Sequence, residues 1–183
     1  SSPHRWLISA ERLDRRDKMV LDLDPPGDDF GKVREGALRL RDHLLEADLC
    51  PFVMTTGSRG LHLVVPLDGE RDFESTRAVA RDLVEGLADR HPKELTTETR
   101  KDRRQGRLFL DYLRNAYGQT SVPPRAAGAR EGAAVGTPLD WEELERGGVG
   151  PRSYHMGNLF RRLGQKGDPW ADFFDRACSL EGL

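Results

Sequence analysis

The sequence predicts a mixed α/β (α+β) fold in one compact domain of 183 residues. Three observations predict it. Short apolar runs are typical of strands, two longer stretches carry apolar residues at helical spacing, and two of the strands flank a tight turn. Hairpins alternate with helices instead of strict strand-helix-strand units, which favours a mixed or antiparallel sheet flanked by helices. The length fits a single domain, which we assign to residues 1–183.

Four short apolar runs predict the strands. They cover residues 19–23, 52–56, 61–67 and 107–113. Pro25 and Pro26 end the first run, because proline cannot continue a paired strand. The second and third runs flank residues 57–60, where two glycines indicate a tight turn. We therefore predict a β-hairpin over 52–67.

Two long helices are predicted from apolar residues three and four positions apart. The first follows the candidate caps Asp28 and Asp29 and extends to about residue 48. The second follows a cap at Asp72 or Ser75 and ends near His91. Two amphipathic helices of this kind can cover one face of a sheet.

The remaining segments are predicted from composition. Residues 93–106 are charged and are expected to form a loop. Residues 118–138 are rich in glycine, proline and alanine, which indicates a flexible loop within the domain. A short helix is expected to start at Pro138, and the tail, residues 150–183, is expected to be helical. Its two short helices are placed near 155–163 and 168–178.

Composition restricts the class of protein. No apolar run reaches the roughly 18 residues of a membrane span, so no membrane partner is expected. Two cysteines are too few for a disulfide scaffold, so a reduced, cytoplasmic location is the expectation. The formal net charge is −2, yet arginines gather within residues 100–130. A local field of this kind can attract an anionic ligand.

Three carboxylates form the strongest candidate for chemistry. Asp22 and Asp24 are separated by one residue at the end of an expected strand, so they point to the same side. Asp111 interrupts an apolar run, where a carboxylate is costly unless it is paired or bound to metal. The alternatives are surface acids for the pair and, for Asp111, a salt bridge with a nearby arginine such as Arg107. Together the three could hold two divalent cations, as in phosphoryl transfer.

A glycine-rich turn is the second candidate. The backbone N–H groups of residues 57–60 can surround an anion, and Ser58 can donate to a phosphate oxygen. Arg59 can form a bidentate pair with a phosphate. His62 alternates with Leu61 and Leu63 and points away from their face. The alternative is a plain hairpin turn with a buried histidine.

With these residues in place, the chain resembles the archaeo-eukaryotic primase superfamily, and within it the polymerase domain of DNA ligase D. The matching stretches are residues 20–26, 55–62, 106–116, 137–144 and 167–170, with His4 and Trp6 upstream. The resemblance implies an RRM-like primase-polymerase catalytic core that adds ribonucleotides or deoxyribonucleotides to DNA primer ends or short gaps in nonhomologous end-joining repair. The resemblance also implies two divalent cations, Mn²⁺ or Mg²⁺, as cofactors. The implied partners are primer-template or gapped DNA, a ligase and a Ku-type end-binding protein, and the implied location is the nucleoid of a prokaryote.

The resemblance also implies roles for individual residues. Asp22, Asp24 and Asp111 would be the catalytic metal ligands. The nucleotide would be bound by Ser58, Arg59, His62, His4, Lys101, Arg104 and Arg130, with Arg114 and Asn115 lining the same site.

The chain departs from the family pattern in three places. Arg59 stands where the family usually has lysine, and Gly128 replaces one of two expected arginines. The sequence also begins at the motif of His4, downstream of the region that binds the DNA 5′-phosphate in the family, so weaker DNA-end binding is expected.

Three other functions compete with this interpretation. These departures favour a non-catalytic nucleotide- or nucleic-acid-binding module on the same fold. A primer-synthesising primase is a further option within the superfamily. A haloacid-dehalogenase-like phosphatase also places an Asp-x-Asp after an apolar strand, but that family expects glycine or threonine where this chain has Pro25 and Pro26.

Overall fold

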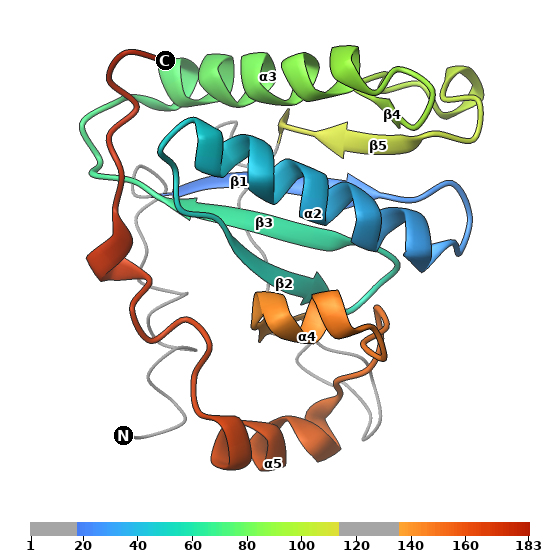
Figure 1. The fold of residues 1–183 in the computed structure, drawn as a ribbon, viewed down its shortest axis with the longest axis vertical. Helices are drawn as coiled ribbons and strands as arrows, with labels where there is room; N and C mark the ends of the chain where they lie inside the picture. Colours follow the sequence, from blue (N-terminus) through green and yellow to red (C-terminus); the bar gives the residue numbers. More distant parts are fainter. Residues whose placement is uncertain (1–17, 114–135) are drawn as a thin grey trace.

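The computed structural model of the chain describes residues 18–113 and 136–183. In these ranges six strands form one sheet, in the order β4-β5-β1-β3-β2-β6 (Figure 1). They are β1 (Lys18–Asp24), β2 (Phe52–Thr56), β3 (Leu61–Pro66), β4 (Leu95–Thr96), β5 (Leu108–Asp111) and β6 (Gly136–Leu139). The β4–β5 pair is parallel and the other pairs are antiparallel. The sheet is mixed, as the sequence predicts.

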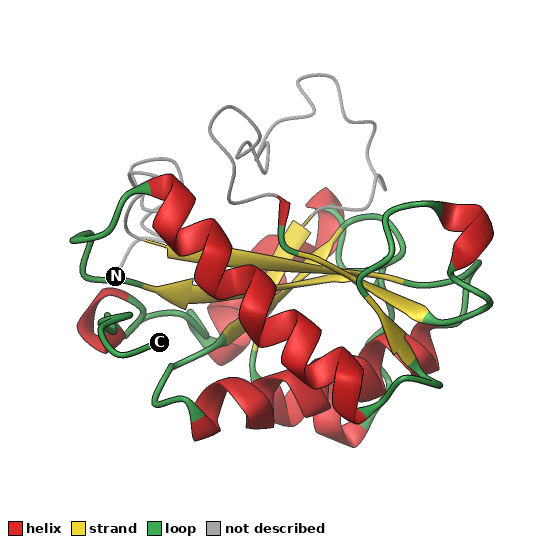
Figure 2. Ribbon diagram, turned by 90° about the horizontal axis from the view of Figure 1, so that it is seen from above, coloured by secondary structure: helices red, strands yellow, loops and turns green. Residues whose placement is uncertain are grey.

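Helices α2 (Phe30–Glu46) and α3 (Phe73–Arg90) cover one face of this sheet (Figures 1 and 2). With them, and leaving aside the edge strand β4 between α3 and β5, the chain follows the order β1-α2-β2-β3-α3-β5. The four strands of this series lie side by side as β5-β1-β3-β2. This arrangement is the RRM-like core that the sequence predicted. Helices α4 (Trp141–Arg146) and α5 (Met156–Lys166) follow, with short 3-10 helices at η2 (Lys101–Arg103) and η4 (Phe174–Arg176).

Residue alternation along β1 assigns its two faces. Leu21 and Leu23 are buried in the main core beneath α2 and α3. Val20 belongs to a smaller apolar cluster that includes Phe173, on the other side of the strand. Because side chains alternate along a strand, Asp22 and Asp24 share the face of Val20. The face opposite the helices therefore carries both carboxylates.

The two long helices begin at predicted caps. The Asp29 carboxylate accepts a hydrogen bond from the Lys32 backbone N–H at 3.2 Å, and the Asp72 carboxylate accepts one from the Ser75 backbone N–H at 2.8 Å. Each bond satisfies a donor that the first helical turn leaves unpaired. Local side-chain chemistry thus determines where the helices start.

Two segments expected to be loops contain strands. Within residues 93–106, β4 pairs with β5, and η2 follows it. At the end of the expected loop 118–138, β6 pairs with β2, while residues 118–135 lie outside the described part. Both strands are at the edges of the sheet. Strand β4 has only two residues, which is too short to show a two-residue periodicity. Strand β6 tolerates Pro138 because an edge strand needs no backbone donor on its outer side. Composition alone therefore pointed to loops.

The tail differs from its predicted helices. The first helix is α5, but near 168–178 only the 3-10 turn η4 forms. Trp170 and Phe173 are stacked, with ring centroids 5.2 Å apart, and both pack against Phe52 on the sheet. This aromatic cluster covers the end of the face that lies away from Asp22 and Asp24. No helix in the described ranges is long and apolar enough to span a membrane.

Candidate functional site

The three carboxylates lie on two adjacent strands. Asp22 and Asp24 end β1, Asp111 ends β5, and the antiparallel register places Asp22 directly opposite Asp111. Directly opposed residues of an antiparallel pair lie on the same face of the sheet. The fold therefore brings together all three carboxylates that the sequence predicted, on the face that α2 and α3 leave open.

His62 lies on the other side of Asp22. It is the cross-strand partner of Asp22 on β3, and its Nε2 lies 3.2 Å from Asp22 Oδ1. His62 is only 3% exposed, and neither ring nitrogen has a hydrogen-bond partner within the described part of the chain. The prediction that His62 points away from Leu61 and Leu63 agrees with this register. Its burial also matches the structural alternative, but its position beside Asp22 makes it part of the site.

Asp24 is held by Arg104, one of the residues assigned to the nucleotide site. Arg104 Nη1 lies 3.2 Å from Asp24 Oδ2. The same guanidinium donates to the backbone carbonyls of Glu98 and Thr99 at 2.9 Å. It also stacks on the Phe109 ring, 3.8 Å from the centroid. These four contacts, which only the folded chain supplies, fix the position of the Arg104 side chain, and its charge neutralises part of the Asp24 carboxylate charge.

Asp111 is oriented by its own strand end. Its Oδ1 accepts a hydrogen bond from the Leu113 backbone N–H at 2.8 Å. Arg107, one example of the nearby arginines in the structural alternative, donates to the backbone carbonyls of Arg104, Pro92 and Arg103. Arg107 therefore braces the η2 segment, and the Asp111 carboxylate stays on the face of Asp22.

The glycine-rich turn is built by local hydrogen bonds. Gly57 has φ +74°, and the Thr56 hydroxyl accepts from the Ser58 backbone N–H and donates to the Gly60 carbonyl. Gly60 is required for packing, because a Cβ there would lie 2.0 Å from the Leu23 carbonyl oxygen. This close approach places the turn beside the end of β1, next to Asp24.

Two side chains of the predicted nucleotide set belong to this turn. Ser58 is exposed, and Arg59 is half-buried, with its Nη1 donating to the Gly27 carbonyl at 3.4 Å. Lys101 is exposed on η2, and Arg104 directly follows this 3-10 helix as its C-cap. His4, Arg114, Asn115 and Arg130 lie outside the described residues. Sequence reasoning missed Phe109, the ring on which Arg104 stacks. The available signal was strand alternation: Phe109 is two residues before Asp111 and so shares its face, whereas Leu108 and Leu110 point to the other face.

The donor set suits a divalent cation by its chemistry. Carboxylate oxygens are the ligands that Mg²⁺ and Mn²⁺ prefer. Within residues 18–113 and 136–183, however, no group of three or more His, Cys, Asp and Glu side chains is arranged to hold a metal ion. Asp24 is paired with Arg104, and Asp22 lies against His62. The carboxylates are thus placed on one face without forming a finished coordination cage.

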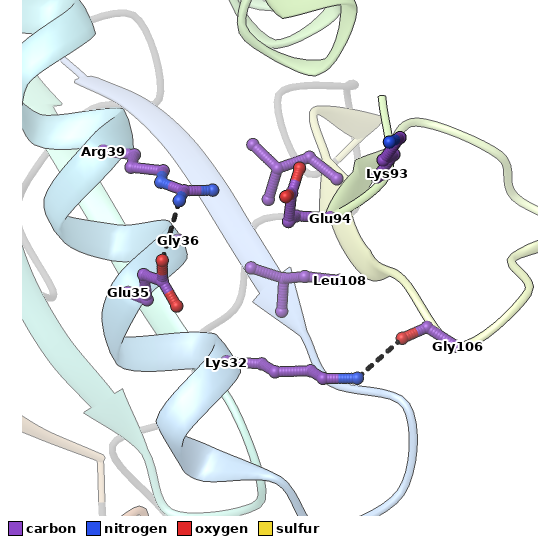
Figure 3. Close-up of a pocket in the computed structure, with 9 residues that line it drawn as sticks. Lys32, Glu35, Gly36, Arg39, Lys93, Glu94, Gly106 and Leu108 are labelled. Atoms are coloured by element: carbon purple, nitrogen blue, oxygen red, sulfur yellow. Dashed lines mark hydrogen bonds and ion pairs between the residues drawn. The ribbon is translucent and has the colours of Figure 1, made fainter. Parts of the chain in front are cut away.

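A cavity of about 270 Å³ lies elsewhere, between α2 and the β4–β5 edge (Figure 3). Lys32, Arg39 and Lys93 are among its charged lining, and Leu108 lies on its wall. Leu108 belongs to the core beneath the helices, so the sheet separates this cavity from the carboxylates. It is therefore not part of the candidate site.

An RRM-like sheet with three carboxylates on the face opposite α2 and α3 is the arrangement expected of the primase-polymerase class of domains. Comparison of the sequence with known families identifies the member of this class. A sequence model of the LigD primase-polymerase domain matches residues 2–170, so the chain belongs to that family.

Relatives and a solved structure agree with this assignment. The chain is 34% identical over 173 residues to the multifunctional non-homologous end joining protein LigD of Pseudomonas aeruginosa, covering 93% of this chain and 20% of that protein. It is 30% identical over 159 residues to the bifunctional LigD of Bacillus subtilis, covering 86% of this chain and 26% of that protein. The polymerase domain of Mycobacterium tuberculosis ligase D, solved in complex with DNA, superposes with a TM-score of 0.77 at 28% identity, covering 88% of this chain and 56% of that one. The chain thus spans only a part of each.

Proposed function

We propose that this chain is a metal-dependent nucleotidyltransferase that adds ribonucleotides or deoxyribonucleotides to DNA primer ends or short gaps. The observation that carries the proposal is the placement of Asp22, Asp24 and Asp111 on one face of two adjacent strands. Three carboxylates on a common face can share divalent cations, and polymerising a nucleotide requires stabilising an attacking and a leaving oxygen. Membership of the LigD primase-polymerase family supports the same reaction.

The carboxylates and the residues around them have different roles in this proposal. Asp22, Asp24 and Asp111 would hold Mn²⁺ or Mg²⁺, which when bound supplies positive charge to the attacking 3′-hydroxyl and the leaving pyrophosphate. Arg59 and Ser58 stand on the adjacent turn, where they would bind triphosphate oxygens. His62 would hold Asp22 in place and donate to the nucleotide. Lys101, Arg104, His4 and Arg130 complete the nucleotide site in this proposal.

The relatives support a proposal for the biological setting. The first relatives are named for non-homologous end joining, and the solved neighbour is a polymerase domain in complex with DNA. We therefore place this chain in end-joining repair, with gapped or primer-template DNA as substrate and with a ligase and a Ku-type end-binding protein as partners.

Primer extension tests the proposal. The substrate is a gapped DNA with a 5′-phosphate, incubated with Mn²⁺ and labelled ribo- or deoxyribonucleotides. We expect templated addition by the wild-type chain and background addition by Asp22→Ala, Asp24→Ala and Asp111→Ala. The matched control is Asp89→Ala, which removes an exposed carboxylate from α3 on the other face of the sheet. Wild-type rates in any of the three site variants would refute the assignment.

A non-catalytic binding module on the same fold is the second candidate. The pairing of Asp24 with Arg104 favours it, because a carboxylate neutralised by a guanidinium is a weaker metal ligand. The same assay separates the two: a binding module retains nucleotide and DNA without turnover at any Mn²⁺ concentration. Omitting the primer strand separates a primase, which would start synthesis on template alone.

A further inference from the structure

A second cavity with a basic lining lies on α5, away from the carboxylates. Its volume is about 230 Å³. It is lined by Tyr154, Asn158, Arg161, Arg162, Gln165 and Lys166. Figure 1 shows α5 beyond α4, at the opposite end of the molecule from α3 and β5. The cavity therefore does not belong to the nucleotide site.

Arg162 is the central residue of this cavity. Its side chain is 5% exposed, and its Nη2 donates to Glu143 Oε1. The guanidinium lies over the Tyr154 ring, 4.7 Å from the centroid. Its Nε and Nη1 are buried and have no hydrogen-bond partner in the described part of the chain. A guanidinium stays charged at any physiological pH, so buried N–H groups without an acceptor are costly.

Glu143 cannot supply the missing acceptor. Its oxygens already accept from the Tyr154 hydroxyl at 2.8 Å and from the Asp140 backbone N–H at 3.1 Å, besides Arg162. Burial raises the pKa of Glu143, but these hydrogen bonds and the nearby cations outweigh it and lower that pKa, so the group is anionic at neutral pH. Lys166 Nζ lies 3.8 Å from the same carboxylate. The carboxylate is shared between two cations.

The side chains around the cavity carry a net positive charge. Arg161 is exposed on the rim, and Lys166 is 51% exposed. With Arg162 these are three cations, against the carboxylates of Glu143 and Asp140. The cavity thus combines unsatisfied buried donors with uncompensated charge. Both features are relieved by an anion with several acceptor oxygens.

We propose that this cavity binds a phosphate group. Arg162 would donate from the floor, with Arg161, Lys166 and Gln165 donating from the rim. A guanidinium and an ammonium together match the charge and the several oxygens of a phosphate. The phosphate would come from the backbone of a nucleic-acid strand or from a free phosphate-bearing molecule. The site does not depend on the proposed nucleotide transfer, so either proposal can fail without the other.

The test monitors the arginine Nε–Hε resonances by NMR in the isotope-labelled full chain. Two ligands are titrated separately: inorganic phosphate, and a short single-stranded DNA without terminal phosphates. Arg161→Glu and Lys166→Glu reverse exposed charges on the rim. They are preferred to Arg162→Ala, which removes one partner of a buried ion pair and threatens folding. Arg81→Glu, on α3, is the control with the same charge change.

We expect a ligand to shift the Arg162 Nε–Hε resonance, and each rim variant to weaken that binding about tenfold or more, as expected for a lost charge-assisted contact. Arg81→Glu should retain the wild-type affinity. A shift with the DNA and a salt slope reduced by about 0.7 per lost contact assigns the phosphate to a strand. A shift with inorganic phosphate alone assigns it to a free molecule. An Arg162 resonance that neither ligand moves overturns the proposal and assigns the unpaired donors to buried water.

Discussion

The His62 imidazole lies against the Asp22 carboxylate, with 3.2 Å between His62 Nε2 and Asp22 Oδ1. The two residues are direct cross-strand partners on β3 and β1. Asp22 in turn faces Asp111 on its other flank. A buried imidazole and two carboxylates thus lie side by side across the adjacent strands β3, β1 and β5. These strands are far apart in the sequence, so only the fold brings the three side chains together.

His62→Ala should weaken nucleotide binding more than DNA binding. The variant removes the imidazole that we propose donates to the nucleotide, and the loss of one hydrogen bond to a charged group should raise the nucleotide Kd about tenfold. Titration calorimetry with a nucleoside triphosphate and fluorescence anisotropy with gapped DNA measure the two affinities. His91→Ala, at the end of α3, is the control. Equal losses for both ligands would count against a triphosphate role, and circular dichroism verifies that the buried site still folds.

Arg104→Lys should reduce both stability and nucleotide incorporation. Lysine keeps the charge but cannot donate to the Glu98 and Thr99 carbonyls while stacking on Phe109. We expect a loss of about 1–2 kcal/mol in the free energy of unfolding, measured by urea denaturation. Arg103→Lys, an exposed neighbour on η2, should be neutral. Two indistinguishable variants would mean that Arg104 does not organise this loop.

Gly60→Ala should destabilise the turn beside β1. The added Cβ would lie 2.0 Å from the Leu23 carbonyl oxygen, so the backbone must move, at a cost of about 1–3 kcal/mol. Gly164→Ala on α5 is the matched control, because a Cβ there meets nothing within 4 Å. That substitution should stabilise the helix by about 0.5–1 kcal/mol. Thermal unfolding of both variants decides the point; a neutral Gly60→Ala would show that the turn can shift freely.

Stability should fall in acid through Glu143. Its pKa is lower in the folded chain than the ordinary value of 4.5, so the unfolded chain binds the proton more readily. The stabilisation is therefore fully present above about pH 4.5 and is lost as the pH falls through the lowered folded value. Urea unfolding measured from neutral to acid pH follows this loss.

Glu143→Gln should remove this part of the pH dependence. It should also cost about 3–5 kcal/mol at neutral pH, because Arg162 is left buried with its counter-ion removed. Glu85→Gln, on an exposed part of α3, should preserve the wild-type profile. An unchanged acid slope in Glu143→Gln would assign the loss of stability to other carboxylates.

Several features of the fold were predictable from local sequence. The alternation of β1 separates Leu21 and Leu23 from Asp22 and Asp24, and the caps at Asp29 and Asp72 mark where the helices start. Each of these signals lies within a few residues. The edge strands β4 and β6 were missed, because two buried residues in one and a proline in the other conceal the strand pattern. In the tail, the helix predicted near 168–178 is replaced by the 3-10 turn η4.

The sequence by itself determined which side chains the site can use and on which side of their own strand they point. Residue type and two-residue periodicity are local properties, and together with the family resemblance they singled out Asp22, Asp24, Asp111 and His62 as candidates. Only the tertiary structure decided which of them meet. Arg104 pairs with Asp24 across 80 positions of sequence, and Arg162 is buried against Glu143. Such contacts depend on strand register and helix packing, which are set by burial of the whole core and not by any one segment.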